Sequence, residues 1–270
     1  MQKLLVCLVS IVICTFPVSC ERVVDVTLNS SMPRYVIEGV ITNNGVCRVL
    51  LSTSNNFDED NNFDAISGAT VSITEDQGGA ILLTERKPGN YQSAYLKGKT
   101  GHTYHLLVNI KGQQFTASSV MPPQAVKIDS VFFSTEILGG TNRRIANACY
   151  TDPPVKGNCY RFVQYINEHK ESTVFVDNDK FNNGHTVAYP LYFRNNDDDA
   201  RRNIISGDTV RIEMHCIDST LYKYWYSLSS LTAAVWAAPA TPSNPVTNIT
   251  GGALGYFSAH TVRSIRVVVH

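Results

Sequence analysis

The segment His102-Thr-Tyr-His-Leu-Leu-Val-Asn-Ile110, followed by Lys111-Gly112 and then Gln113-Gln-Phe-Thr-Ala-Ser118, decides the fold of this chain. Its apolar side chains recur at every second position: Tyr104, Leu106, Val108 and Ile110. Side chains spaced by two lie on one face of a β-strand, and Lys-Gly is typical of a tight turn. The segment therefore predicts a β-hairpin with one apolar face.

The same pattern continues towards the N-terminus. Strands are predicted at 34–42, 47–53, 68–74, 81–85 and 91–95, with Gly-, Pro- and Asn-containing turns between them. Short strands without an intervening helix indicate a β-sandwich rather than a parallel sheet with crossover helices. We expect this sandwich to span residues 30–120 and to fold independently.

The composition agrees with a mainly β protein. The 270 residues include 28 Val, 18 Ile and 22 Thr against only 17 Leu, a balance that favours strands over helices. Lys plus Arg and Asp plus Glu are equal at 23 each, so no excess positive charge indicates a nucleic-acid partner.

A boundary is predicted at Met121-Pro122-Pro123, because consecutive prolines cannot donate to a sheet ladder. The second domain, residues 121–270, is β-rich and carries one helix at about 219–236, with Asp218 or Ser219 as its N-cap. Its predicted strands are 127–135, 143–150, 160–167, 173–176, 187–194, 209–217 and 261–269.

The N-terminus resembles the signal of a bacterial lipoprotein. Lys3 precedes a largely apolar run of thirteen residues, 4–16, too short to span a bilayer as a helix, and Pro17 ends the run just before Cys20. Residues 1–19 are therefore predicted to be a signal peptide, Cys20 the lipidated mature N-terminus, and 20–29 a linker. The alternative is an ordinary secretory signal with Cys20 available for a disulfide.

Four cysteines remain in the mature chain: Cys47, Cys149, Cys159 and Cys216. Cys149 and Cys159 flank a loop containing Pro and Gly that could bring the two sulfur atoms together, so we predict a disulfide between them in an oxidising compartment. For Cys216, which is in phase with Val210, Ile212 and Met214, a buried free thiol is favoured.

No pattern predicts a catalytic residue, a metal ion or a cofactor. Asp58, Asp60, Asn62 and Asp64 alternate like calcium ligands, but Phe63 and Ala69 occupy the positions that require Gly and Glu, so a solvated loop is favoured. His102 and His105 stand three apart on a strand and should point to opposite faces, which excludes a shared metal.

The aromatic run Tyr222, Tyr224, Trp225 and Tyr226 on the predicted helix has two interpretations. Flat rings with polar tips suit sugar stacking or a protein interface, but a helix with aromatics on several sides is more often simply packed. Packing against the second sheet is the interpretation we favour.

In their order, several short stretches resemble a family of Bacteroidetes lipoproteins known as domain of unknown function 4249. They are Ser19-Cys20-Glu21, Gly68-Ala-Thr-Val71, Gly89-Asn-Tyr91, Gly101-His-Thr-Tyr104, Asn158-Cys-Tyr-Arg-Phe162, Gly207-Asp-Thr-Val210, Tyr222-Lys-Tyr-Trp225 and Asn248–Phe257. The resemblance implies an envelope lipoprotein, often encoded beside TonB-dependent receptors, with an N-terminal immunoglobulin-like or carboxypeptidase-regulatory-like sandwich. It implies no catalytic residues.

We therefore expect an outer-membrane lipoprotein, anchored through Cys20, with a non-catalytic binding or accessory role, in partnership with a TonB-dependent receptor in nutrient uptake. The alternatives are an envelope hydrolase with a dispersed active site and a structural or adhesive surface module. The ligand, the periplasmic or surface orientation, and the oligomeric state stay open.

Overall fold

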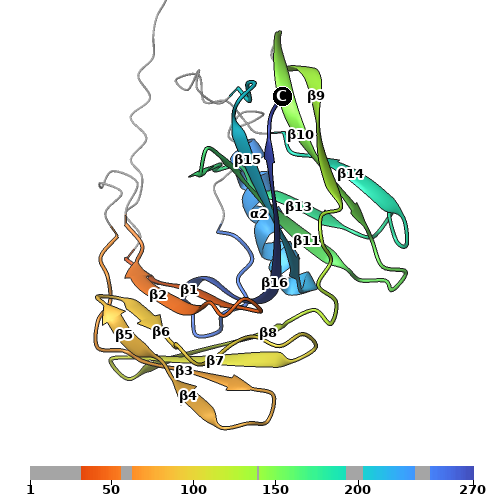
Figure 1. Cartoon of the computed structure of the whole chain (residues 1–270). Helices are drawn as coiled ribbons and strands as arrows, with labels where there is room; N and C mark the ends of the chain where they lie inside the picture. Colours follow the sequence, from red (N-terminus) through yellow and green to blue (C-terminus); the bar gives the residue numbers. More distant parts are fainter. Residues whose placement is uncertain (1–31, 56–62, 139, 193–202, 235–243) are drawn as a thin grey trace, which may run out of the picture. The chain divides into compact units, whose positions relative to one another are not determined.

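The computed structural model describes residues 32–55, 63–138, 140–192, 203–234 and 244–270, and this part of the chain is mainly β, as the alternating segments predict (Figure 1). Its elements are β1 (Tyr35–Thr42), β2 (Cys47–Thr53), β3 (Thr70–Glu75), β4 (Ala80–Leu82), β5 (Thr84–Lys87), β6 (Asn90–Gln92), β7 (Thr103–Ile110), β8 (Gln113–Val120), β9 (Ser130–Leu138), β10 (Thr141–Thr151), β11 (Cys159–Ile166), β12 (His169–Lys170), β13 (Phe175–Asn178), β14 (Thr186–Pro190), β15 (Thr209–Ile217), α2 (Ser219–Ala234) and β16 (Leu254–Val268).

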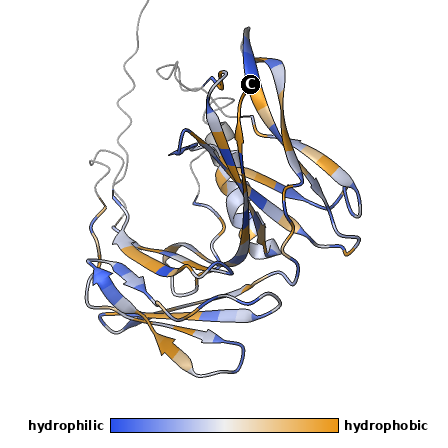
Figure 2. Ribbon diagram, in the orientation of Figure 1, coloured by the Kyte–Doolittle hydropathy of each residue, from blue (hydrophilic) through white to orange (hydrophobic). Residues whose placement is uncertain are grey.

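These strands form three sheets. The largest has the order β12-β11-β15-β16-β1-β2-β6-β5, with β13 also paired to β11. A four-stranded sheet has the order β4-β3-β7-β8, and a three-stranded sheet has the order β14-β10-β9. In the hydropathy colouring of Figure 2, apolar and polar residues alternate along many strands, as expected where one face of a sheet is buried.

The predicted hairpin of β7 and β8 is part of the first sandwich. Tyr104, Leu106, Val108 and Ile110 are all buried, and they pack in one hydrophobic cluster with residues of β1 and β2 such as Ile37 and Val49. A second cluster forms where β11 and β15 meet β10, around Phe162, Ile212 and Ile145. Each cluster thus lies between the large sheet and one of the smaller sheets.

Strand β16 corrects the predicted domain boundary. Its first half pairs in parallel with β1, from Val36 with Leu254 to Thr42 with His260, and its second half pairs antiparallel with β15. Phe257 and Ala259 belong to the first hydrophobic cluster, whereas Ile265 and Val267 pack against the second. Residues 33–270 therefore form one compact unit with two hydrophobic cores, not two separate domains divided at residue 120.

The sequence predicted only residues 261–269 of this strand, whereas the strand begins at Leu254. Gly255 lies inside β16 with a φ of +98°, opposite Ile37. A Cβ atom at this position would overlap the carbonyl oxygen of Ile37. Glycine is needed here so that the two backbones can approach each other within the sheet.

The helix α2 begins where the sequence predicts. The carboxylate of Asp218 accepts hydrogen bonds from the backbone N–H groups of Thr220 and Leu221, at 2.9 and 2.8 Å, which makes Asp218 the N-cap. Among the described residues, no helix has the length and apolar character needed to cross a membrane.

Candidate functional site

A pocket of about 800 Å³ lies on the face of the large sheet that points away from the two hydrophobic cores. Its described lining comes from β1, β2, β11, β15 and β16, from residues 170–174, and from Trp225 and Leu228 of α2. Volumes of this size are typical of small-molecule sites. The pocket is therefore the candidate functional site.

Strand register explains why polar side chains meet there. Arg161 on β11 is paired with His215 on β15, which is paired with Val262 on β16. Within β16, His260 precedes Val262 by two residues and so lies on the same face. The neighbours of these residues in sequence, such as Tyr160 and Met214, belong to the second hydrophobic cluster and do not line the pocket.

Arg161 has an unusual environment. Its guanidinium carbon lies 3.6 Å from the centre of the Trp225 ring, a cation–π contact. Its Nε atom is buried and has no hydrogen-bond partner among the described residues. Burial lowers the pKa of Arg161 from its ordinary value, although an arginine in a protein still keeps its proton. The pocket therefore contains a positive charge whose hydrogen-bonding capacity is not used.

Two histidines form the floor of the pocket. The rings of His215 and His260 are stacked, with 4.6 Å between their centres and an angle of 21°. Burial lowers the pKa of both side chains, that of His260 well below its ordinary value, so both rings are neutral near pH 7. His260 Nδ1 lies 2.8 Å from the hydroxyl of Ser258, whereas His215 Nδ1 is buried without a partner among the described residues.

Glu213 is already held by its neighbours. Its carboxylate lies 3.3 Å from His215 Nε2, accepts a hydrogen bond from the hydroxyl of Tyr165 at 3.4 Å, and is paired with Arg211. The pKa of Glu213 is lowered, and the hydrogen bond with His215 has the largest effect. Arg211 also binds Glu168 at 2.9 Å. The charge of Glu213 is thus neutralised by contacts with residues other than Arg161.

The aromatic run on α2 divides between two environments. Trp225 is buried and packs with Leu221 and Ile217, as the packing interpretation predicts, yet it also lines the pocket beneath Arg161. Tyr224 packs against Trp225 and Tyr256, with ring centres 5.0 Å apart in each pair. Tyr226, in contrast, is more than half exposed. One aromatic residue therefore serves both the packing of the helix and the wall of the pocket.

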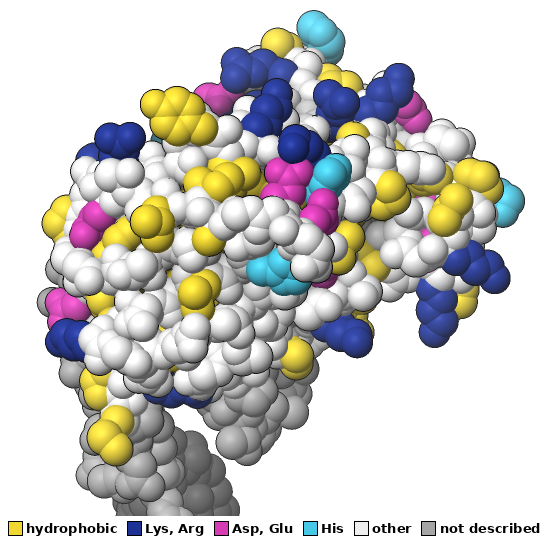
Figure 3. Space-filling view, turned by 90° about the horizontal axis from the view of Figure 1, so that it is seen from below, with side chains coloured by type: hydrophobic (Ala, Val, Ile, Leu, Met, Phe, Trp, Pro, Cys, Tyr) yellow, Lys and Arg dark blue, Asp and Glu magenta, His cyan; other side chains and the backbone are white. Residues whose placement is uncertain are grey.

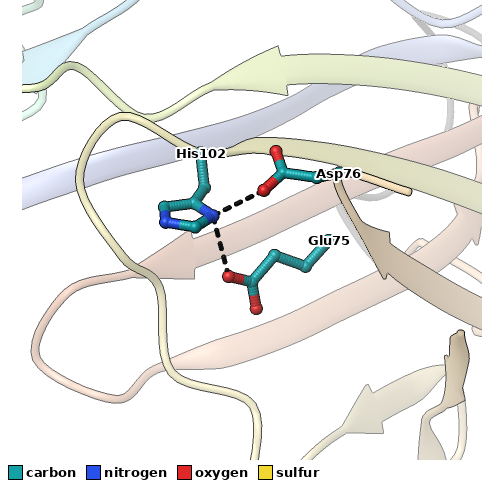
Figure 4. A group of neighbouring side chains, drawn as sticks. All are labelled: Glu75, Asp76 and His102. Atoms are coloured by element: carbon teal, nitrogen blue, oxygen red, sulfur yellow. Dashed lines mark hydrogen bonds and ion pairs between the residues drawn. The ribbon is translucent and has the colours of Figure 1, made fainter. Parts of the chain in front are cut away.

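A second group, Glu75, Asp76 and His102, has three potential metal ligands within reach of one another. Figure 4 shows both carboxylates directed at the same nitrogen, His102 Nδ1, at 3.0 Å for Glu75 and 2.6 Å for Asp76. Lys99 also forms an ion pair with Glu75 at 2.9 Å. The pKa of Asp76 is lowered, and the hydrogen bond from the backbone N–H of Thr103 has the largest effect on it. This is a surface network of ion pairs whose oxygen atoms are already occupied. Figure 3 shows oppositely charged side chains lying next to each other on the face that it draws.

The other predicted positions are placed as follows. His105 binds Ser118 at 2.8 Å and is not part of the His102 group, as the strand alternation predicts. Cys216 is a buried free thiol, also as predicted. Cys20 and residues 58–62 of the calcium-like loop lie outside the described residues.

Cys149 and Cys159 are both free in the structure, in contrast to the predicted disulfide. The loop between them connects two different sheets, because β10 pairs with β9 and β14 whereas β11 pairs with β15. Cys159 packs beside Leu221 and Trp225, and its burial raises the pKa of the thiol to about 11. Such a thiol is protonated near neutral pH and a poor nucleophile.

The pocket residues were not identified from the sequence. Arg161 stands between Tyr160 and Phe162, and His215 stands between Met214 and Cys216, and this alternation was the available signal. A lone polar residue in a strand does not reveal which other strands lie beside it. The meeting of these pocket side chains can therefore be recognised only once the order of the strands in the sheet is known.

No curated protein matches the chain. Among solved structures, it is similar to the alpha chain of the chicken interferon gamma receptor, with 11% identity over 69% of this chain and 90% of that chain. The TM-score is 0.20, which is too low to add to the fold described above. The family model "Domain of unknown function (DUF4249)" matches residues 21–266, so the chain belongs to this family.

Proposed function

We propose that this protein is a lipid-anchored, non-catalytic binding protein that holds a small polar ligand in the pocket on the large sheet. The observation that carries the proposal is the 800 Å³ pocket into which Arg161 brings a positive charge without a hydrogen-bonding partner. Binding sites combine apolar and aromatic walls with a few fixed polar groups, and Trp225, Tyr256 and Val40 supply such walls.

The proposal places the protein at the outer membrane, attached through Cys20 and acting as an accessory to a TonB-dependent receptor in nutrient uptake. Support comes from the signal-like residues 1–19 and from the resemblance of the chain to envelope lipoproteins. Radiolabelled palmitate should label the wild-type protein and not a Cys20→Ala variant. Equal labelling of both proteins would contradict the anchor.

Ligand binding can be tested on the full-length protein in detergent. Thermal unfolding is measured against a panel of amino acids, short peptides, sugars and small carboxylic acids. A ligand of this pocket should raise the thermal midpoint of the wild type but not that of Val40→Trp, in which a larger side chain fills the half-buried wall on β1. The control is Val120→Trp on β8, an exposed position outside the pocket. If every ligand that binds the wild type also binds Val40→Trp, the pocket is not the site.

An envelope hydrolase is a second candidate, because Glu213, His215, His260 and Ser258 form a contiguous series. Two observations weigh against it. Ser258 is only 2% exposed and does not line the pocket, and His215 and His260 contact each other through their ring faces rather than through a hydrogen bond. A hydrolytic triad needs an accessible nucleophile bonded to its base. Turnover of chromogenic esters that is lost in His260→Gln would favour the hydrolase.

A further inference from the structure

The charge of Arg161 is not balanced by any group that the structure places beside it. No ion pair or hydrogen bond to its guanidinium is present in the described part of the chain, and Glu213, the carboxylate whose charge acts on Arg161, is bound to Arg211. Burying a charge without a partner is costly, and a single cation–π contact does not offset the cost. Arg161 is therefore best explained by a partner that arrives from outside.

The stacking geometry fixes which part of Arg161 remains available. The guanidinium uses its flat face against Trp225, at 3.6 Å, so the N–H groups around its edge are left for hydrogen bonding. Guanidinium N–H groups form a planar fork that matches the two oxygen atoms of a carboxylate or a phosphate. The free edge of Arg161 thus selects an oxyanion.

Lys170 adds a second positive charge at the same place. It lines the pocket and has no ion pair within the described ranges. Desolvation lowers the pKa of its ammonium group and the charge of Arg161 lowers it further, which shows that the two cations are close, whereas Glu213 and Glu38 act in the opposite direction. Two cations close together beside one cavity raise the local concentration of anions.

Three acids, Glu38, Glu171 and Glu213, also line the pocket, and Glu213 and Glu38 offset part of this charge. His215 and His260 are neutral, and Glu213 is already paired. Glu38 lies on β1, across the pocket from β11, and is exposed to solvent, while Arg48 on the adjacent strand β2 is also exposed. Glu171 is buried among its own contacts. The positive end of the pocket is thus set by Arg161 and Lys170.

We propose that the ligand carries an oxyanion, a carboxylate or a phosphate, which binds the edge of Arg161 and the ammonium of Lys170, while the remainder of the ligand contacts Trp225 and Tyr256. This inference rests on the proposed binding function and specifies the chemical class of its ligand.

The test uses the full-length protein in detergent, with succinate and inorganic phosphate as probes. Binding is measured by titration calorimetry and by the thermal midpoint, at an ionic strength held constant with sodium chloride. Succinamide, the uncharged analogue of succinate, is the ligand control. We expect a saturable rise of the midpoint with at least one oxyanion, and none with succinamide. Whichever probe binds more tightly identifies the carboxylate or the phosphate as the preferred group.

Variants separate recognition from packing. Arg161→Gln should weaken binding by about tenfold or more, since it removes a charge-assisted pair, and Lys170→Gln should weaken it less. Arg86→Gln, on the exposed strand β5 outside the pocket, is the matched control and should bind like the wild type. Without an oxyanion, Arg161→Met should unfold at the same or a higher temperature than the wild type, because it removes an unpaired buried charge.

Two results would overturn the inference. One is oxyanion binding that is equally tight in the wild type and in Arg161→Gln. The other is a lower thermal midpoint in Arg161→Met together with no response of the wild type to either probe, which would make Arg161 a packing residue. If uncharged molecules bind the wild type and are blocked by Val40→Trp, the binding function holds and only the assignment of the ligand class fails.

Discussion

Asp218 accepts a hydrogen bond of 2.6 Å from the hydroxyl of Ser119, which lies 99 residues earlier in the chain, near the end of β8. The second oxygen of the same carboxylate caps α2 at Leu221. The Ser119 hydroxyl in turn accepts the backbone N–H of Ala259 in β16 at 2.9 Å. This pair of side chains therefore joins the first sandwich, the shared strand and the helix.

Replacing Asp218 by alanine should lower the free energy of unfolding by about 2–3 kcal/mol, because both the helix cap and the bond to Ser119 are lost. Asp218→Asn should cost less, since its amide oxygen can still cap the helix. Urea denaturation of each variant measures the change. The exposed Asp64, whose side chain makes no hydrogen bond or ion pair within the described residues, provides the control Asp64→Ala, for which a change within about 0.5 kcal/mol is expected. Equal effects at the two positions would contradict the role given to Asp218.

Gly255→Ala should lower the free energy of unfolding by about 2 kcal/mol or more, because its Cβ would meet the carbonyl of Ile37 and its φ of +98° is unfavourable for alanine. Thermal or urea unfolding gives the measurement. Gly79→Ala is the matched control, since Gly79 has no close neighbour and no left-handed backbone conformation. A Gly255→Ala protein as stable as the control would show that β1 and β16 are not paired so closely.

A fragment of residues 30–120 should be insoluble or partly unfolded when expressed alone. The fragment lacks β16, so β1 would present an unpaired edge and the first core would lack Phe257 and Ala259. This outcome is the reverse of the independent folding that the sequence predicts. Joining residues 244–262 to the fragment through a flexible linker should restore a cooperative thermal transition. A soluble, cooperatively folded 30–120 fragment would restore the original domain division.

Stability should fall as the pH is lowered from about 7 to about 5, because burial lowers the pKa of His215 and, more strongly, that of His260, so the unfolded chain takes up protons near pH 6.5 more readily than the fold does. The stabilising contribution is thus present above the ordinary histidine pKa and is lost below it. Each histidine contributes a slope of up to about 1.4 kcal/mol per pH unit. Denaturation curves at several pH values should show a smaller slope for His260→Gln, and an unchanged slope for the exposed His169→Gln.

The fold was predictable wherever the pattern is local. The alternation in β7 and β8 and the Asp218 cap depend on neighbouring residues, and both are found as predicted. The parallel pairing of β1 with β16 was missed because no local signal in the sequence marks a parallel partner. The pocket was missed for a related reason: Arg161, His215 and His260 meet only through the order of three strands.

The position of β16 at the end of the chain has a consequence for the order of assembly. Its partner β1 is the first strand in the described part of the chain, and more than 200 residues separate Val36 from Leu254. Contacts so distant in sequence form slowly, because a long loop must close before the pairing stabilises it. Until the last residues are available, β1 remains an open edge, and a chaperone that covers extended strands would be most needed during that interval.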